Sequence, residues 1–98
     1  MNKKFESIFI IKSYRDNNKI KEIINSIDTI IKTENCEIYK SENIGIKNLA
    51  YAINGENKGL YYVVNFKTNN SDNPSGKIST KIKNIEDVLK HIIVDLND

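Results

Sequence analysis

The most informative stretch of the sequence is Gly45-Ile46-Lys47-Asn48-Leu49-Ala50-Tyr51-Ala52-Ile53-Asn54. It predicts the end of a long strand over residues 37–53, bent near Gly45, because a glycine inside a strand indicates a bulge or a close backbone approach. Residues 54–59 are polar and rich in turn formers, which predicts a hairpin loop. The stretch contains no catalytic constellation and no metal-ligand spacing.

Three further segments alternate as strands do. Residues 5–12 are apolar on both faces, which predicts a central strand with neighbours at both edges. Residues 60–67 predict the strand after the hairpin loop, with one apolar face made of Leu60, Tyr62, Val64 and Phe66. Residues 88–96 predict a last strand centred on His91-Ile92-Ile93-Val94.

Isoleucines at helical spacing predict a first helix over residues 17–34. The stripe consists of Ile20, Ile23, Ile24, Ile27, Ile30 and Ile31. Asp16 or Asn17 is expected to cap its start, and Asn35 to end it in the left-handed conformation. Residues 68–76 predict a loop. A short second helix is expected to follow, with Asn73 as cap, Pro74 in its first turn and a stripe of Ile78, Ile82 and Ile85.

The resulting order is β-α-β-β-α-β, which predicts an α+β fold of the ferredoxin-like class. One four-stranded antiparallel sheet would carry two helices on one face, in the strand order fourth, first, third, second. That order places the two-faced strand of residues 5–12 inside the sheet. A chain of 98 residues has the size of one domain, residues 1–98.

Charge and composition limit the classes of function. A net charge of +2 is small for a protein that binds nucleic acid through charge alone, so such contacts are expected to be a local patch or shared with a partner protein. Cys36 is the single cysteine, which excludes an internal disulfide. The apolar runs are shorter than the roughly 20 residues that span a bilayer. We expect a cytoplasmic protein without a membrane segment.

The stretch at residues 45–54 closely resembles the signature of the bacterial small-subunit ribosomal protein six family. In that family a glycine and a basic residue precede a polar or basic residue and Leu-Ala-Tyr, usually followed by proline and isoleucine. The matching residues here are Gly45, Lys47, Asn48, Leu49, Ala50, Tyr51 and Ile53, with Ala52 at the usual proline. The strand of residues 5–11 and the segment Glu86-Asp87-Val88-Leu89-Lys90 resemble the two ends of the family pattern, and Gly59 before a tyrosine-bearing strand also fits.

The resemblance implies a structural component of the small ribosomal subunit and not an enzyme. It implies binding to the central domain of small-subunit ribosomal RNA beside ribosomal protein eighteen. No cofactor, metal or small-molecule substrate is expected. Six residues are candidates for RNA contact: Lys3, Lys4, Lys47, Asn48, Tyr51 and Lys90. Lysines contact phosphate, an amide hydrogen-bonds ribose or base edges, and tyrosine stacks on bases.

Five of the six candidates also have an ordinary structural alternative. Lys47 fits a solvated surface lysine, and Asn48 fits common strand polarity. Tyr51 fits a sheet residue that covers the core with its hydroxyl in water. Lys3 and Lys4 fit a frayed terminus.

A second class of function is a ferredoxin-like protein-interaction module without RNA affinity. Asn48 stands where the family commonly has a second basic residue, and residues 68–80 are more polar than the family's second helix. An acylphosphatase-like enzyme is disfavoured, because the loop Ser13-Tyr14-Arg15-Asp16 has no glycine to cradle a phosphate. The aromatic run of an RNA-recognition motif is missing, Cys36 has no activating neighbour, and His91 has no second metal ligand nearby in sequence.

Overall fold

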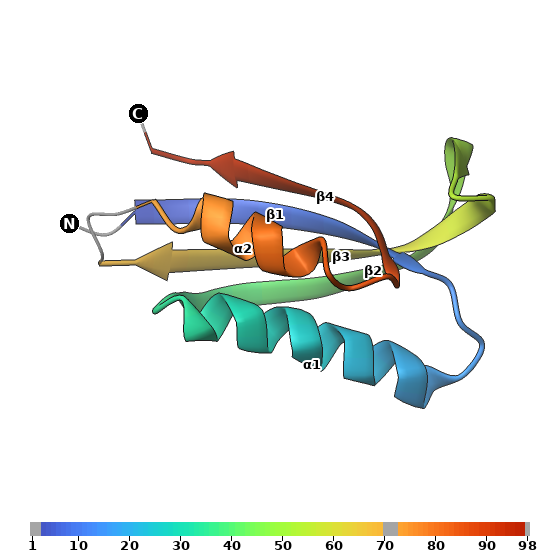
Figure 1. The fold of residues 1–98 in the computed structure, drawn as a ribbon, viewed down its shortest axis with the longest axis horizontal. Coiled ribbons are helices and arrows are strands. Elements are labelled where there is room, and N and C mark those ends of the chain that lie inside the picture. The colour runs from blue at the N-terminus through green and yellow to red at the C-terminus, as the bar shows by residue number, and fades with distance from the viewer. Residues whose placement is uncertain (1–2, 70–72, 98) are drawn as a thin grey trace.

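The computed structural model describes residues 3–69 and 73–97. They form one sheet of four antiparallel strands and two helices that cover one of its faces (Figure 1). In chain order the elements are β1 (Lys3–Lys12), α1 (Asn17–Thr33), β2 (Glu37–Ile53), β3 (Glu56–Thr68), α2 (Ser75–Ile82) and β4 (Val88–Asp95). The strands lie in the order β2-β3-β1-β4. The ferredoxin-like class, the element order and the strand order predicted from the sequence are confirmed.

β1 lies inside the sheet and supplies the deepest part of the core. It pairs with β3 at one edge and with β4 at the other. Alternate side chains point toward the helices and are completely buried: Phe5, Ser7, Phe9 and Ile11. The ring of Phe5 stacks on that of Phe66 with centroids 5.3 Å apart. Such a pair adds about 0.5–1.5 kcal/mol to the stability gained by burial alone.

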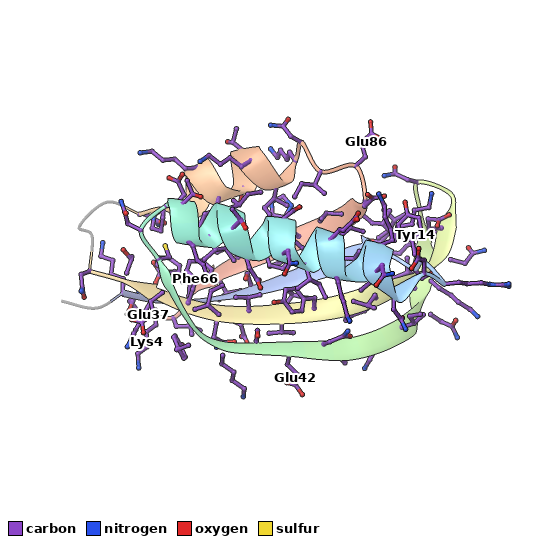
Figure 2. All side chains as sticks on the ribbon, turned by 90° about the horizontal axis from the view of Figure 1, so that it is seen from below. Lys4, Tyr14, Glu37, Glu42, Phe66 and Glu86 are labelled. Carbon is purple, nitrogen blue, oxygen red and sulfur yellow. The ribbon has the colours of Figure 1, made fainter. Side chains whose placement is uncertain are left out.

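α1 lies over the sheet (Figure 2). Its isoleucine stripe packs against this layer. The buried members are Ile20, Ile23, Ile27 and Ile31. Each buried isoleucine stabilises the fold by about 1.5–3 kcal/mol, which outweighs the low helix propensity of β-branched residues. Asp16 caps the helix as predicted, because its carboxylate accepts a hydrogen bond from the Asn18 amide at 2.9 Å. Asn35 follows the helix with a φ of 61°, also as predicted.

The start of α2 differs in detail from the sequence prediction. Pro74, not Asn73, holds the cap position, with φ −80° and ψ −8°. The proline ring fixes φ near the helical value, so Pro74 already has the conformation of the helix that follows. The Asn73 side chain accepts a hydrogen bond from the Ser75 amide at 2.9 Å, so the capping contact predicted for Asn73 is present, one residue before the cap position. Ile85, expected in the helical stripe, lies beyond the end of α2 and still packs against the core.

The turn between β2 and β3 is shorter than predicted. A loop over residues 54–59 was expected, but β3 begins at Glu56, and Asn54 and Gly55 alone connect the two strands. Their φ values of 50° and 82° are those that a two-residue hairpin turn with matching strand twist requires. The polar residues after the turn continue the ladder, because backbone pairing does not need apolar side chains.

A buried polar contact ties α1 to the sheet. The hydroxyl of Tyr62 on β3 donates a hydrogen bond to the carboxylate of Asp28 on α1 at 2.8 Å. Burial and the bond to Asp28 raise the pKa of Tyr62 to about 12. Burial also raises the pKa of Asp28, against the lowering effect of the Tyr62 bond. The pair therefore orients α1 without leaving a buried polar group unsatisfied.

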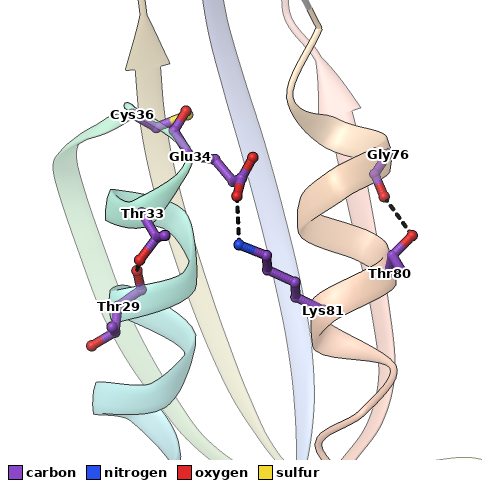
Figure 3. Close-up of polar contacts among 7 residues, drawn as sticks. All are labelled: Thr29, Thr33, Glu34, Cys36, Gly76, Thr80 and Lys81. Atoms are coloured by element: carbon purple, nitrogen blue, oxygen red, sulfur yellow. Dashed lines mark hydrogen bonds and ion pairs between the residues drawn. The ribbon is translucent and has the colours of Figure 1, made fainter.

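A second polar contact joins the two helices where α1 ends (Figure 3). Lys81 of α2 donates to the carboxylate of Glu34 at 2.6 Å. That bond lowers the pKa of the Glu34 carboxyl group. A group whose pKa is lowered by folding stabilises the fold above its unfolded pKa, about 4.3 for Glu. The stabilisation is lost as the pH falls through the lower, folded pKa.

We therefore expect Lys81→Met to destabilise the protein near neutral pH and to lose this effect in acid. The free energy of unfolding, measured by urea titration from about pH 7 to about pH 3, should show the difference from the parent shrinking below the unfolded Glu pKa of about 4.3. Lys21→Met, on an exposed position of α1, is the matched control. A difference between parent and Lys81→Met that stays constant with pH would contradict the role given to Glu34.

Candidate nucleic-acid interface

The pairing of β2 with β3 slips near the end of the hairpin. Asn48 pairs with Lys58, but the next pair joins Ile53 to Glu56. Residues 49–52 of β2 thus stand opposite the single residue Asn57 of β3. The longer strand must arc away from the ladder at this point, as in an enlarged β-bulge. Figure 1 shows the hairpin end turning out of the line of the strands.

Gly59 lets the arc close back on the sheet. A Cβ atom at Gly59 would lie 2.5 Å from Cγ2 of Ile10 and 3.6 Å from Cδ2 of Leu49. These side chains therefore pack directly over the glycine, on the sheet face that the helices do not cover. We call this face the open face; the side chains of Ile8, Ile10, Tyr61, Val63, Lys90 and Ile92 alternate onto it. Leu49 is therefore a packing residue of the hairpin.

A hollow of about 120 Å³ opens beside this contact, between the arc and the open face. Its lining residues are Ile10, Leu49, Ala50, Tyr51, Ile53, Tyr61 and Lys90. Tyr51 is 66% exposed there. Tyr61, Ile10 and Lys90 occupy one row across β3, β1 and β4. The hollow thus combines two tyrosines and a lysine that are far apart in sequence.

Three of the predicted RNA-contact residues share this side of the molecule. Tyr51 and Lys90 line the hollow. Lys47 is exposed and pairs with Gly59, so its side chain lies on the open face as well. Asn48 is the next residue along the strand and points to the opposite face, where Lys58 is its cross-strand partner.

Lys3 and Lys4 lie at the other end of the sheet. They are the first residues of β1 and pair with Thr68 and Lys67, so in the structure they belong to a strand rather than to a frayed terminus. β1 has ten residues, which corresponds to about 30 Å of strand between this end and the hairpin end. Figure 2 shows Lys4 at one end of the molecule and Tyr14, in the loop after β1, at the other. The six candidates therefore do not form one patch.

Two further residues of the hairpin end, Tyr61 and Lys58, are not indicated by the sequence pattern. Tyr61 joins Tyr51 only because the slipped register brings the arc over β3. The polar pattern predicts a loop at Lys58, but the short turn places Lys58 in β3 beside Asn48. The Asn-Gly pair of the turn was the signal that could have revealed it.

A cluster of polar contacts joins the loop after β1 to the segment before β4, next to the hairpin end. The Tyr14 hydroxyl donates a short hydrogen bond to the carboxylate of Asp87, and that bond raises the pKa of Tyr14. Lys19 lies 3.9 Å from the same carboxylate. The ammonium groups of Lys12 and Lys19 lie 5.5 and 5.8 Å from the centroid of the Tyr14 ring. The cluster fixes the loop after β1 to the start of β4, on which Lys90 is carried.

The chain offers little for other chemistry in its described part. Burial raises the pKa of the Cys36 thiol, which keeps it protonated and unreactive. Burial lowers the pKa of His91. Within residues 3–69 and 73–97, no three His, Cys, Asp or Glu side chains gather as metal ligands would. None of the helices formed by these residues is long and apolar enough to cross a membrane.

Comparison with known proteins decides the family. The family model for "Ribosomal protein S6" matches residues 4–95. The chain belongs to the ribosomal protein S6 family. A small ribosomal subunit protein bS6 from Phytoplasma australiense is 32% identical over 92 residues, covering 94% of this chain and 97% of the relative. The bS6 protein of Rickettsia canadensis (strain McKiel) is 32% identical over 90 residues, covering 92% of this chain and 73% of the relative.

Solved structures agree with the fold of the S6 family. The crystal structure of 30S ribosomal protein S6 from Thermotoga maritima superposes with a TM-score of 0.86 at 20% identity, covering 97% of this chain and 88% of that one. The P2 domain of the chemotaxis kinase CheA, solved in complex with the response regulator CheY, matches with a TM-score of 0.50 at 15% identity, covering 98% of this chain and 100% of that one. At these identities both likenesses concern the fold alone.

Packing at Gly59 gives a test of the hairpin geometry. Gly59→Ala should destabilise the protein by about 1–3 kcal/mol, because the added methyl group overpacks the contact with Ile10. Gly76→Ala is the matched control, since nothing lies within 4 Å of its Cβ position in α2, and should stabilise by up to about 1 kcal/mol. Urea unfolding of both variants measures the effect. Equal stability of the two variants would be evidence against the close packing at Gly59.

Proposed function

We propose that this chain is a structural component of the small ribosomal subunit that binds the central domain of its ribosomal RNA together with ribosomal protein eighteen. The observation that carries the proposal is the family match over residues 4–95, which includes the hairpin end and all but one of the candidate residues. In this function the protein performs no catalysis and resides in the cytoplasm, on the ribosome. Lys3 lies just outside the match.

The hairpin end supports RNA contact through a small number of cations. Lys47 and Lys90 are exposed on the open face, and Lys58 is exposed on the opposite side with Asn48. Phosphate contacts of this kind orient a protein on RNA without reading sequence. A net charge of +2 is compatible with such local binding when a protein partner shares the RNA surface.

Lys47→Ala should weaken binding to a transcript of the central domain and reduce the slope of log affinity against log salt by about one. Filter binding in the presence of ribosomal protein eighteen, over a series of salt concentrations, measures both quantities. Lys21→Ala removes the same charge from the exposed side of α1 and should leave the slope unchanged. If both variants keep the parental slope, Lys47 makes no phosphate contact.

The open face also supports a protein partner. Exposed apolar side chains alternate along and just beyond β4: Ile92 is 46% exposed, Val94 43% and Leu96 47%. Ile92 lies beside Ile8 and, through it, Val63, so the apolar surface extends across three strands. Apolar surface of this kind on one face marks protein contacts more often than RNA contacts.

Ile92→Glu should weaken binding of ribosomal protein eighteen by tenfold or more, about 1.4 kcal/mol, because it places a charge in the apolar surface. The effect on folding should be small, since the side chain is half exposed. Asn25→Glu introduces the same charge on the exposed face of α1 and is the control. Calorimetric titration with the purified partner gives both affinities. Equal affinities for the two variants would show that the partner does not bind this face.

The alternative of a protein-interaction module without RNA affinity is separated by the same two experiments. It is favoured by the apolar open face and by the neutral Asn48. It predicts loss of partner binding in Ile92→Glu. It also predicts that the parent protein shows no salt-dependent binding to RNA.

A further inference from the structure

The hollow beside Tyr51 has room for one flat ring. Its volume of about 120 Å³ is below the roughly 300–1,000 Å³ of pockets that enclose a whole small ligand, so an RNA helix does not fit inside and only part of a nucleotide can be enclosed. Ile10, Leu49 and Ile53 supply apolar walls. Tyr51 and Tyr61 supply aromatic rings, and Tyr51 presents most of its surface to the exterior.

One lysine lines this hollow and a second lies on the same face of the sheet. Lys90 belongs to its lining and is carried by β4. Lys47 is carried by β2 and lies on the same open face. The nearest acidic position on this face of β2 is Glu42, which pairs with Val63 in the row beyond Tyr61. The carboxylates of the hairpin end, Glu56, Glu86 and Asp87, line a separate hollow with Lys12 and Tyr14. An occupant with an aromatic ring and a negative charge therefore matches the hollow better than a neutral or cationic one.

The rigidity of the hollow comes from elements already described. The row of Tyr61, Ile10 and Lys90 is fixed by ladder pairing across three strands. The other wall, with Tyr51, is held by the packing of Leu49 over Gly59. The site thus exists before any ligand binds, which lowers the cost of ordering it.

We propose that this hollow binds a single unpaired nucleotide of the ribosomal RNA, with its base against Tyr51 and Tyr61 and its flanking phosphates against Lys90 and Lys47. The proposal rests on the proposed function. It specifies an unpaired nucleotide as the RNA element that the hairpin end binds. The nucleotide must be unpaired, because a base inside an RNA helix exposes its edges and not its ring face. Every base has such a face, so the hollow selects an unstacked conformation rather than a sequence.

Ultraviolet crosslinking in native small subunits tests the proposal without any substitution. After digestion with ribonuclease and trypsin, mass spectrometry should find a nucleotide on the peptide of residues 48–58, at Tyr51, or on the peptide of residues 59–67, at Tyr61. Nucleotide adducts confined to other peptides, such as residues 33–40 with the exposed Tyr39, would overturn it.

Chemical probing of the RNA in subunits that carry protein variants gives the second test. Stacking on an aromatic residue changes the equilibrium constant between the stacked and the free base by about 5- to 150-fold. Tyr51→Leu should therefore raise the reactivity of one unpaired nucleotide by at least about fivefold. Tyr51→Phe keeps the ring and should preserve the protection. Tyr39→Leu, at the opposite end of the sheet, is the control and should leave the same nucleotide protected.

The outcomes separate this proposal from the function on which it rests. If the protein is present in small subunits but no nucleotide responds to Tyr51→Leu and none crosslinks to Tyr51 or Tyr61, the hollow does not hold a base, while the ribosomal function stands. Crosslinks from these tyrosines to a protein side chain would assign the hollow to the protein partner and overturn the proposal. Absence of the chain from small subunits would overturn both.

Discussion

The shape of the hairpin end depends on one close contact, in which Ile10 and Leu49 pack over Gly59. A Cβ atom at that position would lie 2.5 Å from the Ile10 side chain. Because glycine has none, β2 can leave the ladder after Asn48, arc past Asn57 and return against the open face before the turn. The return of β2 brings Tyr51 next to Tyr61 and Lys90. A single small residue in β3 thus allows a side chain of β2 to meet groups that ladder pairing fixes on β3 and β4.

A weakly charged chain can still present exposed lysines on one face of its sheet. Several carboxylates are engaged in holding the fold: Asp87 with Tyr14 and Lys19, Glu34 with Lys81, and Glu37 with Lys67 at 3.9 Å. These contacts lie at the ends of the sheet and between the helices. The charges of Lys47 and Lys90 lie on the open face, where a partner can reach them. Net charge alone therefore says little about where an anion can bind.

The parts of the fold that depend on strong local patterns could be predicted from the sequence. The isoleucine stripe gave α1, the two-faced alternation of residues 5–12 gave a central strand, and Gly45 marked a bulge, where the structure has a φ of 101° and a register shift. The polar residues 56–59 predict a loop but belong to β3, because a side-chain pattern does not report backbone pairing.

The arrangement of the candidate residues could not be predicted in the same way. Asn48 follows Lys47 directly, yet alternation sends the two side chains to opposite faces. Lys3 and Lys4 are at the far end of β1 from the hairpin. The grouping of Tyr51, Tyr61 and Lys90 depends on a register slip between strands, which no local pattern encodes. Family resemblance points to the segment but not to the partners that it meets in space.

The most direct test of the whole account is the position of this protein in a sucrose gradient of cell lysate, quantified fraction by fraction by mass spectrometry. A structural component of the small subunit should peak with small ribosomal subunits and their precursors, in constant ratio to other small-subunit proteins. Recovery of the protein only in the slowly sedimenting fractions at the top of the gradient would contradict the account.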